Sequence, residues 1–103
     1  MTEGVAGDAL ACLIVRAHGL VQGVGFRYAC VRQARTLGLA GWVRNRRDGT
    51  VEALLQGMPE QVEWMCDWMR GGDDSPARVD RLDVQLGAPP YTHCDGFEQV
   101  PTA

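Results

Sequence analysis

A glycine-rich stretch that ends in an arginine carries the residue types in this 103-residue sequence best suited to chemistry. It reads Gly19-Leu20-Val21-Gln22-Gly23-Val24-Gly25-Phe26-Arg27. Its glycines allow positive φ, so successive backbone N–H groups can turn toward one centre and bind an anion. Arg27 adds a permanent charge whose forked N–H groups match phosphate oxygens. The stretch therefore predicts a phosphate-binding loop; the alternative is a plain connector whose arginine faces water.

The loop differs from the two best-known phosphate loops. A P-loop ends in Gly-Lys-Ser/Thr, and all ten basic residues of this chain are arginine. The dinucleotide fingerprint needs a third glycine at the position of Tyr28. A different kind of anion loop is therefore expected.

The elements on either side of the loop are a strand and a helix. The short apolar run at residues 12–17 predicts a buried strand. Apolar residues at helical spacing predict a helix from about 26 to 37, whose N-terminus adds partial positive charge to the loop. His18 lies beside the loop, but as a single unsupported histidine it is assigned no chemistry.

The rest of the chain predicts a hairpin, a second helix and two more strands. Residues 40–47 and 50–56 alternate as strands around a two-residue turn at Asp48-Gly49. The second helix opens at Pro59 and has a core stripe that Trp64 and Trp68 are expected to extend. A fourth strand is expected at 82–86 and a short last one near 97–100.

This order predicts an α+β fold, the ferredoxin-like βαββαβ sandwich, with two helices on one face of a four- or five-stranded antiparallel sheet. The first two strands then run parallel with the third between them, so their C-terminal ends share one edge of the sheet. Asn45, near the end of the second strand, is therefore expected beside the glycine loop. The first and second strands lie two strand spacings apart, about 10 Å. An arginine and an asparagine that reach into this gap can share it with a phosphate and a water.

Length and charge limit the functions that this chain can have. One domain is expected over residues 11–101, after a disordered tail at 1–10. The net charge is −3, yet residues 11–50 carry seven arginines against Asp48 alone. A basic half within an acidic protein favours a compact anionic substrate over a long nucleic acid, so no nucleic-acid partner is expected.

The sequence shows no feature of a membrane protein or a secreted protein. No apolar run reaches the length of a membrane span, and the N-terminus has no secretory signal, so a cytoplasmic location without membrane contact is expected. The four cysteines are far apart and form no C-x-x-C pair. They are expected to be reduced, and whether any of them pair stays open: Cys12, Cys30, Cys66 and Cys94.

Three motifs together resemble one known family. They are Val21-Gln22-Gly23-Val24-Gly25-Phe26-Arg27, then Leu37-Gly38-Leu39 with Gly41-Trp42-Val43-Arg44-Asn45, and finally Asp48-Gly49 with Val51-Glu52. This pattern resembles the acylphosphatases over residues 12–100. The resemblance implies the ferredoxin-like fold and the hydrolysis of acyl phosphates to a carboxylate and inorganic phosphate. It also implies that the reaction needs no metal. A preformed anion cradle without metal ligands predicts inhibition by inorganic phosphate or sulfate, and a monomer without a cofactor is expected.

The resemblance also assigns the site residues. The family's phosphate-binding arginine matches Arg27, and its water-orienting asparagine matches Asn45. Its cradle of backbone amides matches Gln22, Gly23, Val24, Gly25, Phe26 and Arg27. The leaving carboxylate of an acyl phosphate has a low pKa and needs no general acid, which fits a site without a catalytic histidine.

Two positions depart from the family pattern. The hydroxyl residue that often follows the asparagine is Arg46 here, and its role stays open. The family's Gly-Pro after the second helix is out of register in residues 71–76. The same fold occurs as a domain of a hydrogenase-maturation carbamoyltransferase, but this chain ends where the domain ends, so a free-standing enzyme is expected. The alternative is a non-catalytic ferredoxin-like module that binds an anion or RNA for regulation.

Overall fold

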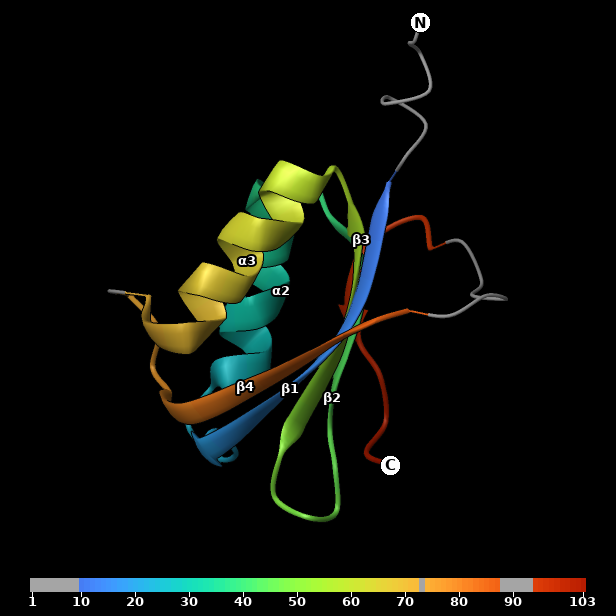
Figure 1. The fold of residues 1–103 in the computed structure, drawn as a ribbon. Helices are drawn as coiled ribbons and strands as arrows, with labels where there is room; N and C mark the ends of the chain where they lie inside the picture. The colour runs from blue at the N-terminus through green and yellow to red at the C-terminus, as the bar shows by residue number, and fades with distance from the viewer. Residues whose placement is uncertain (1–9, 73, 88–93) are drawn as a thin grey trace, which may run out of the picture.

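A computed structural model of the chain describes residues 10–72, 74–87 and 94–103. Two helices cover one face of a five-stranded sheet (Figure 1), which confirms the predicted α+β ferredoxin-like sandwich. The elements in chain order are β1 (Ala11–Leu20), α2 (Phe26–Thr36), β2 (Ala40–Asn45), β3 (Val51–Gly57), α3 (Pro59–Gly71), β4 (Arg78–Leu86) and β5 (Phe97–Gln99). Apart from Leu10, the predicted tail at 1–10 lies outside the described residues.

The strand order is β4-β1-β3-β2-β5, so β3 separates the parallel strands β1 and β2 as predicted. The prediction of a fully antiparallel sheet is wrong in one detail, because β5 pairs with β2 in parallel. The reason lies in where β4 ends: the Gly87 N–H bonds the Cys12 carbonyl near the start of β1, and β2 starts at the same edge of the sheet. A last strand that starts from this edge runs parallel to β2.

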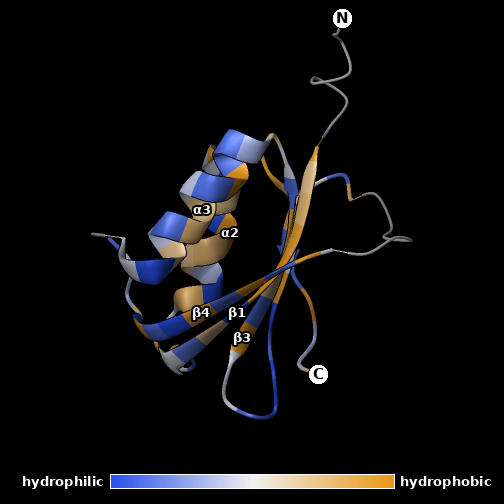
Figure 2. Ribbon diagram, viewed as in Figure 1, coloured by the Kyte–Doolittle hydropathy of each residue, from blue (hydrophilic) through white to orange (hydrophobic). Residues whose placement is uncertain are grey.

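The core lies between the sheet and the two helices (Figure 2). Apolar residues of α3 at helical spacing form the predicted stripe and are buried: Val62, Met65, Cys66 and Met69. Trp68 stacks on Phe26 with ring centroids 6.0 Å apart, but Trp64 is 54% exposed, so the prediction that it extends the stripe is wrong. Both tryptophans lie at the margin of the stripe. Trp68 packs against Phe26 of α2, which explains why it is less exposed than Trp64.

The hairpin between β2 and β3 has a longer turn than the predicted two residues. β2 ends at Asn45, and the Gly49 N–H bonds the Arg46 carbonyl at 3.1 Å, with Gly49 in the left-handed region at φ 93. The Asp48 carboxylate accepts hydrogen bonds from the hydroxyl and the N–H of Thr50, at 2.6 and 3.0 Å. These two bonds lower the pKa of Asp48 and stabilise the longer turn.

No helix in the described part of the chain combines the length and the apolar character needed to cross a membrane.

Gly41 is the position in the sheet that least tolerates a side chain. Its φ of +139 is unfavourable for other residues, and an added Cβ would overlap the Leu54 carbonyl oxygen. We predict that Gly41→Ala lowers the free energy of unfolding by at least about 3 kcal/mol, measured by urea denaturation. Gly71→Ala is the matched control, because nothing lies within 4 Å of its Cβ position, and its stability should be unchanged or higher. Equal stability of the two variants would contradict this account.

Candidate active site

The glycine-rich loop connects β1 to α2, as the sequence predicts. Gly23 and Gly25 both have positive φ, 77 and 83, and Gly25 is the N-cap residue of α2. No side chain caps this helix and its first turn holds no acidic residue. Among the described residues, the N–H groups of the first turn thus have no capping side chain, and no acidic residue of that turn neutralises the partial positive charge of the helix end. Such a helix end is suited to bind an anion.

Arg27 lies in the first turn of α2 and is half-buried. Within the part of the chain that the structure describes, its guanidinium has no hydrogen bond or ion pair. Of the other nine arginines, the guanidinium groups of Arg32, Arg47 and Arg78 also lack an acceptor among the described residues, and six have one: Arg16, Arg35, Arg44, Arg46, Arg70 and Arg81. The arginine that sequence analysis assigns to phosphate thus keeps its donors available for a ligand.

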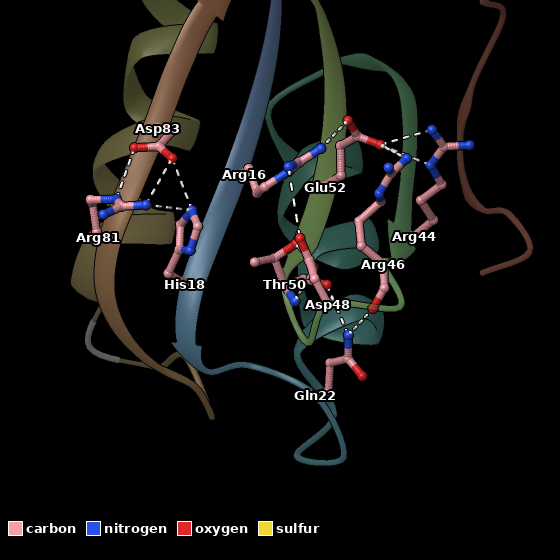
Figure 3. A network of polar contacts seen from close by, with 10 residues as sticks. All are labelled: Arg16, His18, Gln22, Arg44, Arg46, Asp48, Thr50, Glu52, Arg81 and Asp83. Carbon is pink, nitrogen blue, oxygen red and sulfur yellow. Dashed lines mark hydrogen bonds and ion pairs between the residues drawn. The ribbon is translucent and has the colours of Figure 1, made fainter. Parts of the chain in front are cut away.

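The Gln22 side chain ties the loop to the β2–β3 hairpin (Figure 3). Its Nε2 donates to the carbonyl oxygens of Arg46 and Thr50, at 2.8 and 2.9 Å. These carbonyls flank the turn that follows Asn45, so the loop lies beside the end of β2, as the topology predicts. Sequence analysis gave Gln22 a backbone role and missed this side-chain contact, because a glutamine in a loop has no periodicity that would indicate its partner.

Asn45 is the last residue of β2 and pairs with Val51, which pairs in turn with Ala17 of β1. Val51 and Ala17 are fully buried beneath the helices, so Asn45 belongs to the same side of the sheet. Its backbone carbonyl accepts from the Ala103 N–H at 3.0 Å. Its side-chain oxygen Oδ1 is buried and has no hydrogen-bond partner among the described residues.

The strand end is therefore held by backbone hydrogen bonds rather than by the Asn45 amide. Leaving a buried carbonyl oxygen unpaired costs about 1–3 kcal/mol, so the amide does not stabilise the fold in this arrangement. The side chain thus keeps an unused hydrogen-bond acceptor on the side of the sheet where the loop enters.

Arg46, whose role the sequence left open, points to the opposite side of the sheet. Its NH1 lies 3.4 Å from Oε1 of Glu52 on the face without helices (Figure 3). In this arrangement its side chain does not reach Asn45, while its backbone carbonyl accepts the Gln22 bond.

His18 also lies on the face without helices. Its Nε2 is 2.9 Å from Oδ2 of Asp83, and this contact is the main cause of the lowered pKa of that carboxyl. Arg81 contacts both groups (Figure 3). His18 therefore belongs to a surface polar cluster, consistent with the absence of any assigned chemistry.

The cysteines do not contribute a nucleophile near the loop. All four are free thiols, and burial raises the pKa of the two in the core, Cys30 and Cys66. Among the described residues, no group of three or more His, Cys, Asp or Glu side chains is arranged to hold a metal ion.

The sequence profile of the acylphosphatase family matches residues 13–99. The chain belongs to the acylphosphatase family. It is 50% identical to "Acylphosphatase 1" of Ralstonia nicotianae, over 96% of this chain and 98% of that protein. The fold is similar to the crystal structure of acylphosphatase from Bacillus subtilis, with a TM-score of 0.79 and 34% identity over 88% and 98% of the two chains. An acylphosphatase from Coxiella burnetii gives a TM-score of 0.81 at 26% identity, over 97% and 100%.

A large cavity at the other end of β1 is less suited to a phosphoryl group than the glycine loop is. A cavity of about 600 Å³ lies around the start of β1 and the end of β3, next to Leu10, Cys12 and Met58. The glycine loop follows the other end of β1, at Leu20. A phosphoryl group is compact and charged, so a shallow cradle of N–H donors suits it better than an apolar cavity.

Proposed function

We propose that this chain is an acylphosphatase, which hydrolyses the carboxyl–phosphate bond of small acyl phosphates to a carboxylate and inorganic phosphate. The observation that carries the proposal is a pair of unsatisfied groups beside one loop. Arg27 has no acceptor among the described residues, at an uncapped helix N-terminus, and the Asn45 amide oxygen lacks a donor there as well. An anion and a water would satisfy both.

The loop and Arg27 have the first role in the proposed mechanism. The backbone N–H groups of residues 22–27 surround the phosphoryl oxygens, and the Arg27 guanidinium donates two more hydrogen bonds. Phosphoryl transfer depends mostly on positioning and on stabilising charge at these oxygens. Because the donors are fixed before the substrate binds, little reorganisation accompanies the reaction.

The Asn45 amide has the second role, which is to hold the attacking water in line with the leaving group. The water oxygen forms a bond to phosphorus as the bond between phosphorus and the acyl oxygen breaks, and the electron pair leaves with the carboxylate. The proton of the water passes to a phosphate oxygen of the substrate. No side chain acts as a general acid, because the carboxylate is a good leaving group at neutral pH.

The same arrangement indicates what else the site binds. Its donors face the phosphoryl group and leave the acyl side open, so substrates with different acyl groups should react. Inorganic phosphate or sulfate should compete for the cradle. We expect a cytoplasmic monomer with no membrane or nucleic-acid partner. An RNA-binding module of this fold would stack bases on aromatic rings of the sheet face without helices. There the Arg44 guanidinium covers the Trp42 ring at 4.6 Å. This contact does not favour the RNA-binding alternative.

The activity itself is tested by phosphate release. We predict that the purified chain hydrolyses benzoyl phosphate at the same rate with and without EDTA, and that inorganic phosphate inhibits competitively, because the chain's own donors bind the anion. The fall in ultraviolet absorbance as benzoyl phosphate is consumed measures both effects, because added inorganic phosphate does not interfere with it. An inactive chain, or activity lost with EDTA and restored by a divalent ion, would contradict the proposal.

Arg27→Lys tests the cradle. We predict a fall in kcat/KM of at least about 10²–10³-fold, because a lysine cannot reproduce the two-pronged contact with phosphate oxygens. The control is Arg32→Lys, an exposed position on the same helix, which should keep parental kinetics. Circular dichroism shows whether both variants are folded. Near-parental turnover of Arg27→Lys would exclude the assigned role.

Asn45→Ala tests the water-holding role. We predict that kcat falls by about 10²–10³-fold while inhibition by phosphate is nearly unchanged, because the amide acts on the water and not on the bound anion. The free energy of unfolding should change by less than about 1.5 kcal/mol, since the amide oxygen has no partner to lose among the described residues. If stability and phosphate affinity fall together with activity, Asn45 is structural.

A further inference from the structure

We propose that Glu52 is a positioning residue for the active site, although it lies on the opposite face of the sheet. Its carboxylate holds the two arginines that flank Asn45 and so fixes the direction of the Asn45 side chain. The inference rests on the proposed function, in which the Asn45 amide holds the attacking water.

Glu52 is the centre of a row of charged side chains across three strands (Figure 3). In the sheet register it pairs with Arg16 of β1 on one side and with Arg44 of β2 on the other. Arg44 binds Oε1 through Nε at 2.9 Å and NH2 at 2.8 Å, and Arg16 lies 3.4 Å from Oε2. Glu52 is only 7% exposed, so these contacts are shielded from water better than surface ion pairs are.

Arg46, which follows Asn45 in the sequence, contacts the same carboxylate as Arg44. Its NH1 lies 3.4 Å from Oε1, the oxygen that Arg44 also binds. Side chains alternate along a strand, so Arg44 and Arg46 point to the face without helices while Asn45 points to the side of the loop. One carboxylate oxygen thus holds both chain neighbours of Asn45.

Backbone contacts complete this arrangement around Asn45. The Gln22 side chain holds the Arg46 carbonyl at 2.8 Å, and the Ala103 N–H binds the Asn45 carbonyl at 3.0 Å. The backbone of residues 44–46 is therefore held by the carboxylate on one face and by the loop on the other. Because the amide of Asn45 has no partner among the described residues, its position depends on this backbone.

The charge balance explains why the carboxylate is needed. Arg16, Arg44 and Arg46 converge on Glu52 with side chains 35%, 27% and 31% exposed. Asp48 adds one further negative charge, 3.8 Å from Arg16. Without the Glu52 charge, the three guanidinium groups repel one another and the chain on both sides of Asn45 moves. The β2–β3 ladder has six register pairs, so the fold persists while its last pair, Asn45 with Val51, loosens.

The test is Glu52→Gln, with Asp83→Asn as the matched control for the loss of a carboxylate on the same face. We expect Glu52→Gln to lower kcat by about 10–10²-fold, since small displacements of a positioning group have effects of this size. KM and phosphate inhibition should stay within about twofold, because the loop is intact. In an Asn45→Ala background, Glu52→Gln should change kcat by less than about twofold, because the residue through which it acts is gone. Asp83→Asn should leave the kcat of each background unchanged.

An NMR measurement tests positioning without any activity. The side-chain NH2 signals of Asn45, identified by their loss in Asn45→Ala, should shift or broaden in Glu52→Gln and stay in place in Asp83→Asn. Arg44→Gln is the second variant if Glu52→Gln does not fold. It removes one flanking contact but leaves Glu52 paired with Arg16 and Arg46, and it should lower kcat by about 3–10-fold without changing phosphate inhibition.

The outcomes separate this inference from the proposed function. Three results would each overturn the role of Glu52 and leave the proposed function standing. The first is that Glu52→Gln lowers kcat equally in the parent and in Asn45→Ala, and the second is that the Asn45 NH2 signals do not change in Glu52→Gln. The third is that Glu52→Gln keeps parental kcat although Asn45→Ala is impaired. An inactive parent would refute the proposed function instead, and the Asn45 signals would still decide whether Glu52 positions that side chain.

Discussion

The pairing of β3 with both β1 and β2 is the constraint on which the candidate site depends. Residues 51–55 are all buried, so β3 can lie only in the middle of the sheet. Its register then sets Ala17, Val51 and Asn45 in one row across three strands. Because β1 and β2 are parallel, the loop that leaves β1 and the last residue of β2 meet at the same edge. The pairing of both strands with β3 is enough to bring the loop and Asn45 together, without pairing between β1 and β2.

The two faces of the β2–β3 hairpin carry different residues. Asn45 belongs to the side of the sheet where the loop enters, and its neighbours Arg44 and Arg46 belong to the other side. A change of one residue in strand register would exchange these roles. The buried apolar residues on the helix side prevent such a change: Val43, Val51, Ala53 and Leu55. Core packing therefore specifies which of three consecutive polar residues lies on the side of the sheet where the glycine loop enters.

Much of this could be predicted from the sequence. Local periodicity, which depends on residues close together in the sequence, predicts the loop and both helices. Combined with the βαββαβ topology, it also predicts the position of Asn45. The Gln22 contact and the contact between Arg16 and Glu52 could not be predicted, because they join residues 24 to 36 positions apart in the sequence. The length of the turn was missed because it depends on the bonds between the Asp48 side chain and Thr50. The direction of β5 depends on the edge at which β4 ends, which no local pattern records.

The uncapped start of α2 gives the proposed phosphate site a consequence for folding. A Ser, Thr, Asp or Asn side chain at the N-cap can satisfy one of the first N–H groups of a helix, an interaction worth about 1 kcal/mol. Here Gly25 occupies that position and has no side chain to offer. In the proposed function a phosphate bound at this helix end takes the place of the missing cap, and a ligand that binds only the folded chain raises its stability by mass action. On that proposal, the protein resists unfolding best where phosphate or substrate is abundant, and each release of product returns the helix end to its less stable state.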